Sequence, residues 1–143
     1  MTTWVLDASV AAKWFLPSAQ ETLTEEAFLL LEGYSKGHTR FLVPDLFWPE
    51  FGNILWKAVR LGRMSRQSAE AGIVALGERK IPTAPTSSLL KDAFAIAATF
   101  DRTVYDCVYV ALAVAEDAPL VTADERLVNA LGARFPVRWL GSL

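Results

Sequence analysis

Histidine and cysteine are almost absent from this sequence: His38 and Cys107 are the only residues of each type among 143. Zinc sites and the Ser-His-Asp or Cys-His nucleophiles of many hydrolases are built from these side chains. A single cysteine also excludes a disulfide within the chain and fits a reducing compartment. We therefore expect His38 to be a surface turn residue, Cys107 to be a small core residue, and any chemistry to depend on oxygen ligands.

Long apolar runs and a strong net charge are missing as well. Although 52% of the residues are hydrophobic, no run reaches the roughly 18 apolar residues of a membrane-spanning helix. The N-terminus lacks the basic region and long apolar core of a signal peptide, so we expect a cytoplasmic protein with no membrane partner. The net charge of −2 gives no global positive field, so a polyanion would have to be bound by a local basic patch or through a metal.

The sequence does contain short apolar runs that alternate with helical patterns. Strands are expected at residues 4–6, 41–43, 81–85, 120–122 and 137–140. Helices are expected at residues 8–15, 24–36, 45–62, 65–76, from Ser87 or Ser88 to 100, 103–115 and 124–131. The two prolines of 81–85 suit only a sheet edge. This alternation predicts one α/β domain, residues 1–143, with a parallel sheet covered by helices on both faces.

Four acids stand out by their positions: Asp7, Glu50, Asp106 and Asp124. Three follow a strand or a turn near a strand, where open α/β sheets place their ligands, and Asp106 lies in an otherwise apolar helix. Carboxylates brought together repel one another, and Mg²⁺ or Mn²⁺ removes that cost by binding their oxygens. Alternatively, Asp7 and Asp124 cap helices, Glu50 favours its helix dipole, and Asp106 has a polar partner.

Three polar residues near these acids are candidates for a supporting role. Ser9 either caps the first helix or orients Asp7. Thr122 forms a hydrogen bond with Asp124 or with a phosphate; alternatively, it is an ordinary residue at a strand end. Asn53 lies one helical turn from Glu50 and either holds it in place or is solvated.

The only dense basic cluster is formed by Lys57, Arg60, Arg63 and Arg66. It is interpreted either as a solvated surface or as a track for RNA phosphates that leads away from the acids.

Four segments carry a resemblance to a known family: VLDASVAAKWFLP from Val5, PDLFWPEFGNILWKA from Pro44, TVYDCVYVALA from Thr103 and LVTADERL from Leu120. In this order and spacing they resemble the PIN-domain ribonucleases of the VapC toxin type, over nearly the whole chain. Cys107 stands where the family commonly has alanine, and residues 78–88 match only loosely.

This resemblance implies a three-layer α/β/α sandwich with a parallel sheet in the order 3-2-1-4-5. It also implies a homodimer and a small antitoxin protein that plugs the site. The four acids would be the catalytic and metal-binding residues, supported by Ser9, Asn53 and Thr122.

The expected activity is therefore cleavage of RNA by a metal-dependent endoribonuclease that acts as the toxin of a toxin–antitoxin pair. The metal would activate a water molecule and stabilise charge on the phosphate, and single-stranded RNA is the expected substrate. A catalytically idle PIN-like binding module is the alternative. A receiver domain needs an acid pair after the first strand and a lysine after the last one, but Ala8 and Gly141 stand there. A dinucleotide fold lacks its glycine-rich turn.

Large aromatic residues exceed what a small core needs. A core can be built from Val5, Leu6, Leu42, Val43, Leu55, Val108, Leu112 and Val121. Some of Trp14, Phe15, Phe47, Trp48 and Trp56 are therefore expected to bind an antitoxin helix, whose tail could carry an arginine to the acids. Otherwise they bury one another or a homodimer seam.

Overall fold

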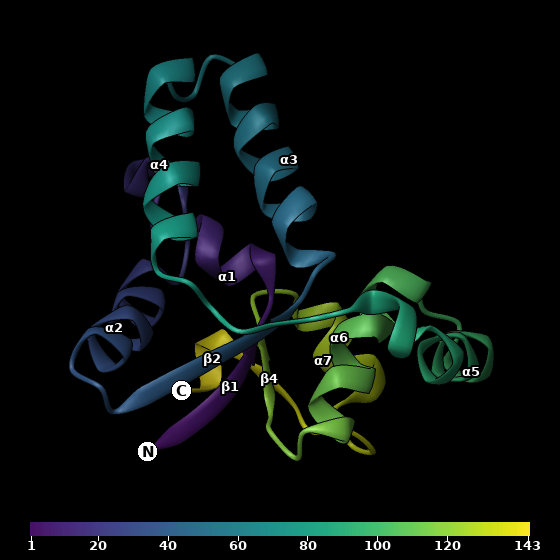
Figure 1. The fold of residues 1–143 in the computed structure, drawn as a ribbon. Helices are drawn as coiled ribbons and strands as arrows, with labels where there is room; N and C mark the ends of the chain where they lie inside the picture. Colours follow the sequence, from purple (N-terminus) through teal and green to yellow (C-terminus); the bar gives the residue numbers. More distant parts are fainter.

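A parallel sheet of five strands forms the centre of the computed structural model, which describes residues 1–143 (Figure 1). The strands are β1 (Thr2–Leu6), β2 (Thr39–Pro44), β3 (Thr83–Ala84), β4 (Leu120–Thr122) and β5 (Val137–Trp139). Their order is β3-β2-β1-β4-β5, and every pairing is parallel. The predicted order 3-2-1-4-5 is confirmed, and the proline-flanked β3 lies at an edge.

Helices cover both faces of this sheet. They are α1 (Ala8–Ala12), α2 (Thr24–Ser35), α3 (Phe47–Arg60), α4 (Arg66–Glu78), α5 (Leu90–Phe100), α6 (Val104–Ala115) and α7 (Glu125–Leu131). In Figure 1, α1 and α2 lie on one side of the strands and α5, α6 and α7 on the other, while α3 and α4 form a hairpin that rises beyond the carboxyl ends of the strands. The α/β/α sandwich is thus confirmed. No helix is long and apolar enough to cross a membrane.

Three of the predicted helix starts are fixed by side-chain caps. The Ser65 hydroxyl accepts a hydrogen bond from Ser68 N at 3.0 Å, and the Thr103 hydroxyl accepts one from Asp106 N at 3.1 Å. The Asp124 carboxylate accepts bonds from the backbone N–H groups of Arg126 and Leu127 at 3.0 and 3.4 Å. These caps satisfy N–H groups that have no partner within the helix.

Two local predictions are wrong. Helix α1 ends at Ala12 rather than at residue 15. Pro17 disfavours helical geometry at the residue before it, and the Trp14 indole instead donates to the carbonyl of Ala27 at 2.8 Å, which ties the turn to α2. Neither Ser87 nor Ser88 caps α5, whose first flanking residue is Leu89. The two serines lie in a 3₁₀ turn, where Ser88 donates to the Pro85 carbonyl.

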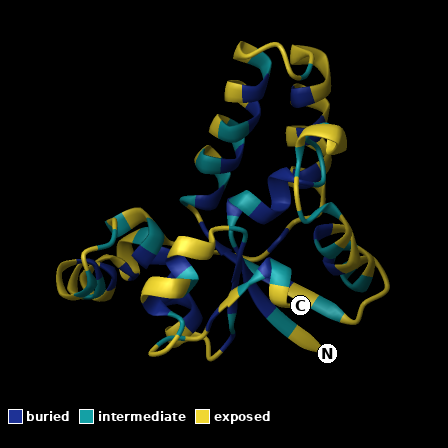
Figure 2. Ribbon diagram, turned by 180° about the vertical axis from the view of Figure 1, so that it is seen from behind, coloured by how far each residue is buried: buried dark blue, intermediate teal, exposed yellow.

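The core extends from the strands into α1 and α6, where buried residues gather (Figure 2). Residues 107–113 of α6 are all buried because this helix packs between the sheet and α5. Of the predicted core, only Leu42 is half-buried rather than buried. Cys107 is a core residue as expected, and burial is the main cause that raises the pKa of its thiol to about 11. His38 is exposed.

Candidate active site

An acidic pocket of about 250 Å³ opens beyond the carboxyl ends of β1 and β4. The four acids reach it from the β1–α1 junction, α3, α6 and the β4–α7 junction. Its lining residues are Asp7, Ala8, Ser9, Glu50, Asn53, Ile54, Asp106 and Asp124. The fold therefore brings Asp7 and Asp124, which lie near opposite ends of the sequence, into the same pocket. Asp106 lies in the first turn of α6, at the start of its buried stretch.

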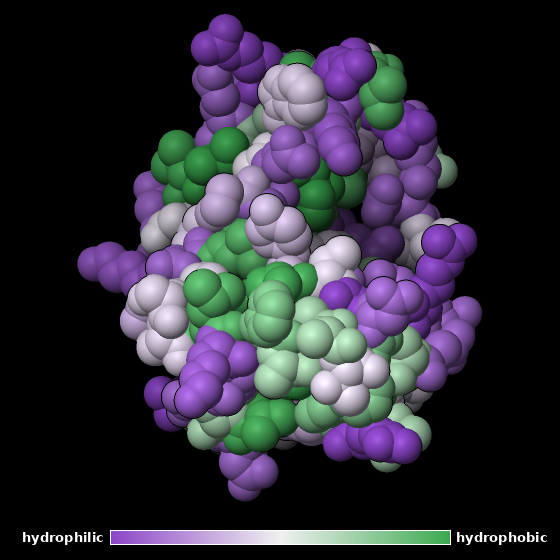
Figure 3. All heavy atoms as spheres, turned by 90° about the vertical axis from the view of Figure 1, so that its right-hand side faces the viewer, coloured by the Kyte–Doolittle hydropathy of each residue, from purple (hydrophilic) through white to green (hydrophobic).

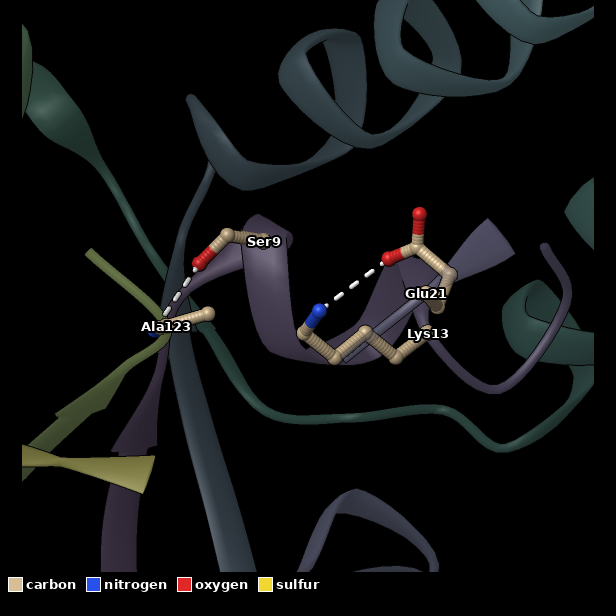
Figure 4. A network of polar contacts seen from close by, with 4 residues as sticks. All are labelled: Ser9, Lys13, Glu21 and Ala123. Atoms are coloured by element: carbon tan, nitrogen blue, oxygen red, sulfur yellow. Dashed lines mark hydrogen bonds and ion pairs between the residues drawn. The ribbon is translucent and has the colours of Figure 1, made fainter. Parts of the chain in front are cut away.

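Asp7 is held by two neutral hydroxyl groups. Ser9 Oγ donates to Asp7 Oδ2 at 2.9 Å, and Thr122 Oγ1 donates to the same oxygen at 2.6 Å. The two hydroxyl groups are fixed in turn by the backbone N–H groups of Ala123 and Asp124, and Figure 4 shows the contact between Ser9 and Ala123. Asp7 forms no side-chain cap on α1. Ser9 therefore orients Asp7, and Thr122 joins the two strand ends that carry acids.

Glu50 is held by a residue that sequence reasoning missed. The phenol of Tyr109, which is only 3% exposed, donates to Glu50 Oε1 at 2.6 Å across the gap between α6 and α3. No hydrogen bond joins Asn53 to Glu50; Asn53 is exposed at the rim of the pocket. The available signal was the position of Tyr109 three residues after Asp106, on the same helical face.

The donors leave oxygens available to a ligand. In Glu50 the Tyr109 bond is to Oε1, and in Asp124 the helix-cap bonds are to Oδ1. Each carboxylate therefore keeps a second oxygen for the pocket. The structural interpretation of Asp124 as a helix cap is correct for one of its oxygens, and it does not prevent the other from binding a ligand.

Three of the four acids, Asp7, Glu50 and Asp106, are harder to ionise in this pocket than they are in water. Burial is the largest cause that raises the pKa values of Asp7, Glu50 and Asp106, while hydrogen bonds from hydroxyl groups oppose the rise. Negative neighbours add to it: Asp106 acts on Asp7, Asp7 and Asp106 act on Glu50, and Asp124 acts on Asp106. No lysine or arginine lines the pocket, and the ion pairs of the protein lie elsewhere. The cation that opposes the rise is Arg102, which lowers the pKa of Asp106 from outside the lining.

The donor chemistry of the pocket fits a hard divalent cation. All four acidic side chains offer oxygen, the ligand atom that Mg²⁺ and Mn²⁺ prefer. A bound cation would also offset the negative neighbours that help to raise the pKa values of Asp7, Glu50 and Asp106. No group of three or more acidic, histidine or cysteine side chains is drawn together tightly enough to hold a metal in the structure as it stands. The carboxylates would therefore have to move toward a cation.

The basic cluster is divided between two surfaces. Lys57 and Arg63 line a hollow between α3 and the α1–α2 connection, and neither has a carboxylate partner. Arg60 instead lies over the ring of Trp56 at 5.5 Å, and Arg66 pairs with Glu70 at 2.7 Å. All four basic residues are exposed. The cluster is therefore not one continuous track.

The aromatic residues that follow α1 and those of α3 also differ in exposure. Phe47 is fully buried and stacks on Phe51, so for this residue the alternative, burial against another aromatic, holds. Trp14, Phe15 and Trp48 are half-buried, and Trp56 is 53% exposed.

The structure is a parallel α/β/α sandwich with an acidic pocket beyond the ends of its strands. Comparison with known families identifies the family to which a chain with this fold and site belongs. Residues 4–131 match the model of the PIN domain, and the chain belongs to this family. It is 34% identical to Ribonuclease VapC3 of Pyrobaculum aerophilum over 134 residues, which cover 92% of this chain and 94% of that protein. It is 36% identical to Ribonuclease VapC1 of Mycobacterium tuberculosis over 92 residues, which cover 62% of this chain and 66% of that protein.

Solved structures share the fold. The crystal structure of PAE2754 from Pyrobaculum aerophilum superposes with a TM-score of 0.68 at 22% identity, covering 99% of this chain and 91% of that one. VapBC2 from Rickettsia felis, bound to a DNA fragment from its promoter, gives 0.64 at 10% identity and covers 96% and 98%. A toxin–antitoxin complex from Klebsiella pneumoniae gives 0.62 at 13% identity and covers 94% and 95%. At these identities the likeness concerns the fold.

Proposed function

We propose that this protein is a divalent-metal-dependent endoribonuclease and the toxin of a toxin–antitoxin pair. The observation that carries the proposal is the acidic pocket, where four carboxylates of a PIN domain meet without a cationic side chain. Relatives named ribonucleases support it. An enzyme of this kind would act in the cytoplasm, where its RNA substrate is found.

Asp7, Glu50, Asp106 and Asp124 would hold Mg²⁺ or Mn²⁺ through their pocket-facing oxygens. When bound, such a cation lowers the pKa of a water molecule and stabilises charge on phosphate oxygens. The side chains of the protein orient these ligands. Ser9 and Thr122 fix the direction of the Asp7 carboxylate, Tyr109 fixes that of Glu50, and Asn53 offers an amide at the rim.

The substrate we propose is single-stranded RNA. The acidic pocket alone repels a polyanion, so phosphates away from the cut need positive charge nearby. Lys57, Arg60, Arg63 and Arg66 supply such charge on and after α3, the helix that also carries Glu50 and Asn53. Their individual roles stay a prediction.

Cleavage of RNA under controlled metal supply is the decisive test. Wild-type protein and Asp106→Asn, purified side by side, are incubated with total RNA in Mg²⁺, in Mn²⁺ and in EDTA, with single-stranded DNA as a second substrate. We expect wild-type protein to cut RNA only with metal and the variant to be inactive. Cutting that persists in EDTA, or equally in Asp106→Asn, would reject the proposal.

The partner we propose is an antitoxin helix that covers aromatic residues just after α1 and on α3. An apolar hollow of about 110 Å³ lies beside α1 and is lined by Trp14, Phe15 and Tyr34 among others. The solved toxin–antitoxin complexes with the same fold support such a partner. Co-expression with the adjacent small reading frame should give a stable complex and relieve toxicity. A protein that is harmless alone and captures no product of that frame would remove the toxin role while leaving the nuclease intact.

A homodimer is the second assembly we propose. Figure 3 shows apolar side chains gathered on the side of the molecule that carries α5, where Leu90 and Phe94 are 49% and 63% exposed. These two residues lie four apart and therefore share a helical face. Light scattering of wild-type protein and Phe94→Glu tests this face: a dimer that becomes a monomer in the variant supports the proposal, and an unchanged mass contradicts it.

A further inference from the structure

The hollow lined by Lys57 and Arg63 has a volume of about 240 Å³ and adjoins the acidic pocket. Ile54 lines both cavities, so they are neighbours along α3. Lys57 lies on the same helix one turn beyond Asn53, which is about 5.4 Å of helix. A strand of RNA that places one phosphate at the acids would therefore bring its next nucleotide to this hollow.

The lining of the hollow combines apolar walls with positive charge. Leu16, Pro17 and Ile54 supply apolar surface, and Gln20 supplies an amide. Lys57 and Arg63 are its cations, and both are exposed and free of any carboxylate partner. Arg60 and Arg66, by contrast, are already engaged with Trp56 and Glu70. Free cations beside an apolar wall match the phosphate and the base of a nucleotide.

The one acid that lines this hollow is neutralised. Glu21 Oε1 forms an ion pair at 3.0 Å with Nζ of Lys13, whose side chain is only 8% exposed. Figure 4 shows the two residues facing each other. Lys13 follows Ser9 by four residues. Ser9 lines the acidic pocket, whereas Lys13 does not line the hollow itself and acts on it through Glu21. The pair removes a negative charge that would otherwise repel a phosphate there.

We propose that this hollow is a nucleotide subsite, which binds the nucleotide of single-stranded RNA next to the one that is cut. Lys57 and Arg63 bind its phosphate, Leu16 and Pro17 contact its base, and Lys13 acts as a positioning residue by neutralising Glu21. The inference rests on the proposed ribonuclease function, because the acidic pocket fixes where the strand is cut.

Binding of RNA at varied salt tests the division of the basic cluster. The probe is a short fluorescein-labelled single-stranded RNA of mixed sequence, measured by anisotropy on protein that carries Asp106→Asn to prevent cutting. Into this background we place either Lys57→Ala with Arg63→Ala, or the matched pair Arg60→Ala with Arg66→Ala, which removes the same charge.

Loss of two phosphate contacts should flatten the slope of log affinity against log salt by about 1.4 for the Lys57 and Arg63 pair. We expect a clearly smaller change for the Arg60 and Arg66 pair. Equal changes in the two pairs, or a larger change for Arg60 and Arg66, would overturn the subsite. Weaker antitoxin capture by the Lys57 and Arg63 pair, with an unchanged RNA slope, would assign the hollow to the protein partner and overturn it as well.

Rescue of Lys13→Met by Glu21→Gln tests the neutralising role. Lys13→Met leaves Glu21 as an unpaired negative charge in the hollow, so RNA binding should weaken severalfold, and adding Glu21→Gln should restore it. RNA binding that stays as weak in the double variant would mean that Lys13 only fixes the loop. Melting temperatures of both variants are measured first, and RNA binding is compared at a temperature at which both are folded.

Failure of the subsite and failure of the nuclease proposal give different results. If wild-type protein cuts RNA with Mg²⁺ but both subsite tests fail, only the subsite is wrong. If wild-type protein does not cut RNA with either metal, the nuclease proposal fails.

Discussion

The carboxylates of the acidic pocket and the carboxylate of the neighbouring hollow differ in the partners that hold them. In the pocket, the side chains that donate to Asp7 and Glu50 are neutral hydroxyl groups, and no cationic side chain lines the wall. In the hollow, Glu21 is paired with the buried ammonium of Lys13. A half-buried carboxylate is costly without a counter-ion. The comparison therefore shows where the protein satisfies its own charge and where it leaves charge for a ligand.

Removing a carboxylate from the pocket should destroy activity but not the fold. Asp106→Asn takes away a proposed metal ligand, so we expect cleavage to fall by more than the roughly 10- to 100-fold that is typical for losing an outer partner of a metal site. The melting temperature in EDTA should stay the same or rise, because a repulsive charge is lost. Asp101→Asn, an exposed acid in the turn before α6, is the control. A large fall in melting temperature would show that Asp106 has a structural partner.

Removing Lys13, the cation that pairs with Glu21, should instead lower the stability of the fold. Breaking a buried ion pair costs about 3–5 kcal/mol because one charge stays uncompensated, and Lys13 is 7% exposed. Lys13→Met should therefore lower the free energy of unfolding, as measured by urea denaturation. Adding Glu21→Gln should recover most of the loss. A stability loss below about 1 kcal/mol, the value of an exposed pair, would contradict the comparison.

The neutral donors of the pocket should matter for metal affinity more than for stability. Tyr109→Phe removes the bond that directs Glu50, and we expect Mn²⁺ binding, measured by calorimetry, to weaken about tenfold, as for other outer partners of metal ligands. Tyr105→Phe on the same helix, where the side chain is 63% exposed, is the matched control. Unchanged Mn²⁺ affinity together with a lower melting temperature would mean that Tyr109 is only a packing residue.

The smallest expected effect concerns pH. The pKa of Asp106 is raised above its ordinary value of 3.8, so the folded protein without metal binds this proton more tightly than the unfolded chain does. Its stabilising contribution is fully present below that ordinary value and is lost as pH rises through the higher folded pKa. In EDTA, the stability of Asp106→Asn relative to wild type should therefore grow toward neutral pH, by on the order of 1 kcal/mol per pKa unit.

Saturating Mg²⁺ should cancel this pH dependence, because the cation replaces the proton. Chemical denaturation across the pH range, with and without the metal, is the measurement. If the difference in stability between Asp106→Asn and wild type does not change with pH in EDTA, the pKa of Asp106 is not raised in the folded protein.

Much of the fold could be predicted because its signals are local. The apolar run at residues 4–6 and the prolines around β3 identified a buried strand and an edge strand. Ser65 and Thr103 identified helix starts. One error occurred where a distant contact overrides a local preference, since the Trp14 indole binds the carbonyl of Ala27 beyond the end of α1. The other occurred where a local 3₁₀ turn takes up the two serines expected to begin α5.

Residue order is enough to identify the acids that stand at strand ends and in α6, because an acid directly after a buried strand is a neighbour in the chain. How those acids are held depends on contacts between segments that are far apart in the chain. Tyr109 and Glu50 are 59 residues apart, and Thr122 and Asp7 are 115 apart. The division of the basic cluster also came from packing, since Trp56 and Glu70 engage two of its arginines and leave Lys57 and Arg63 free. Hydrogen bonds and ion pairs depend on distance in space, which residue spacing along a chain does not fix.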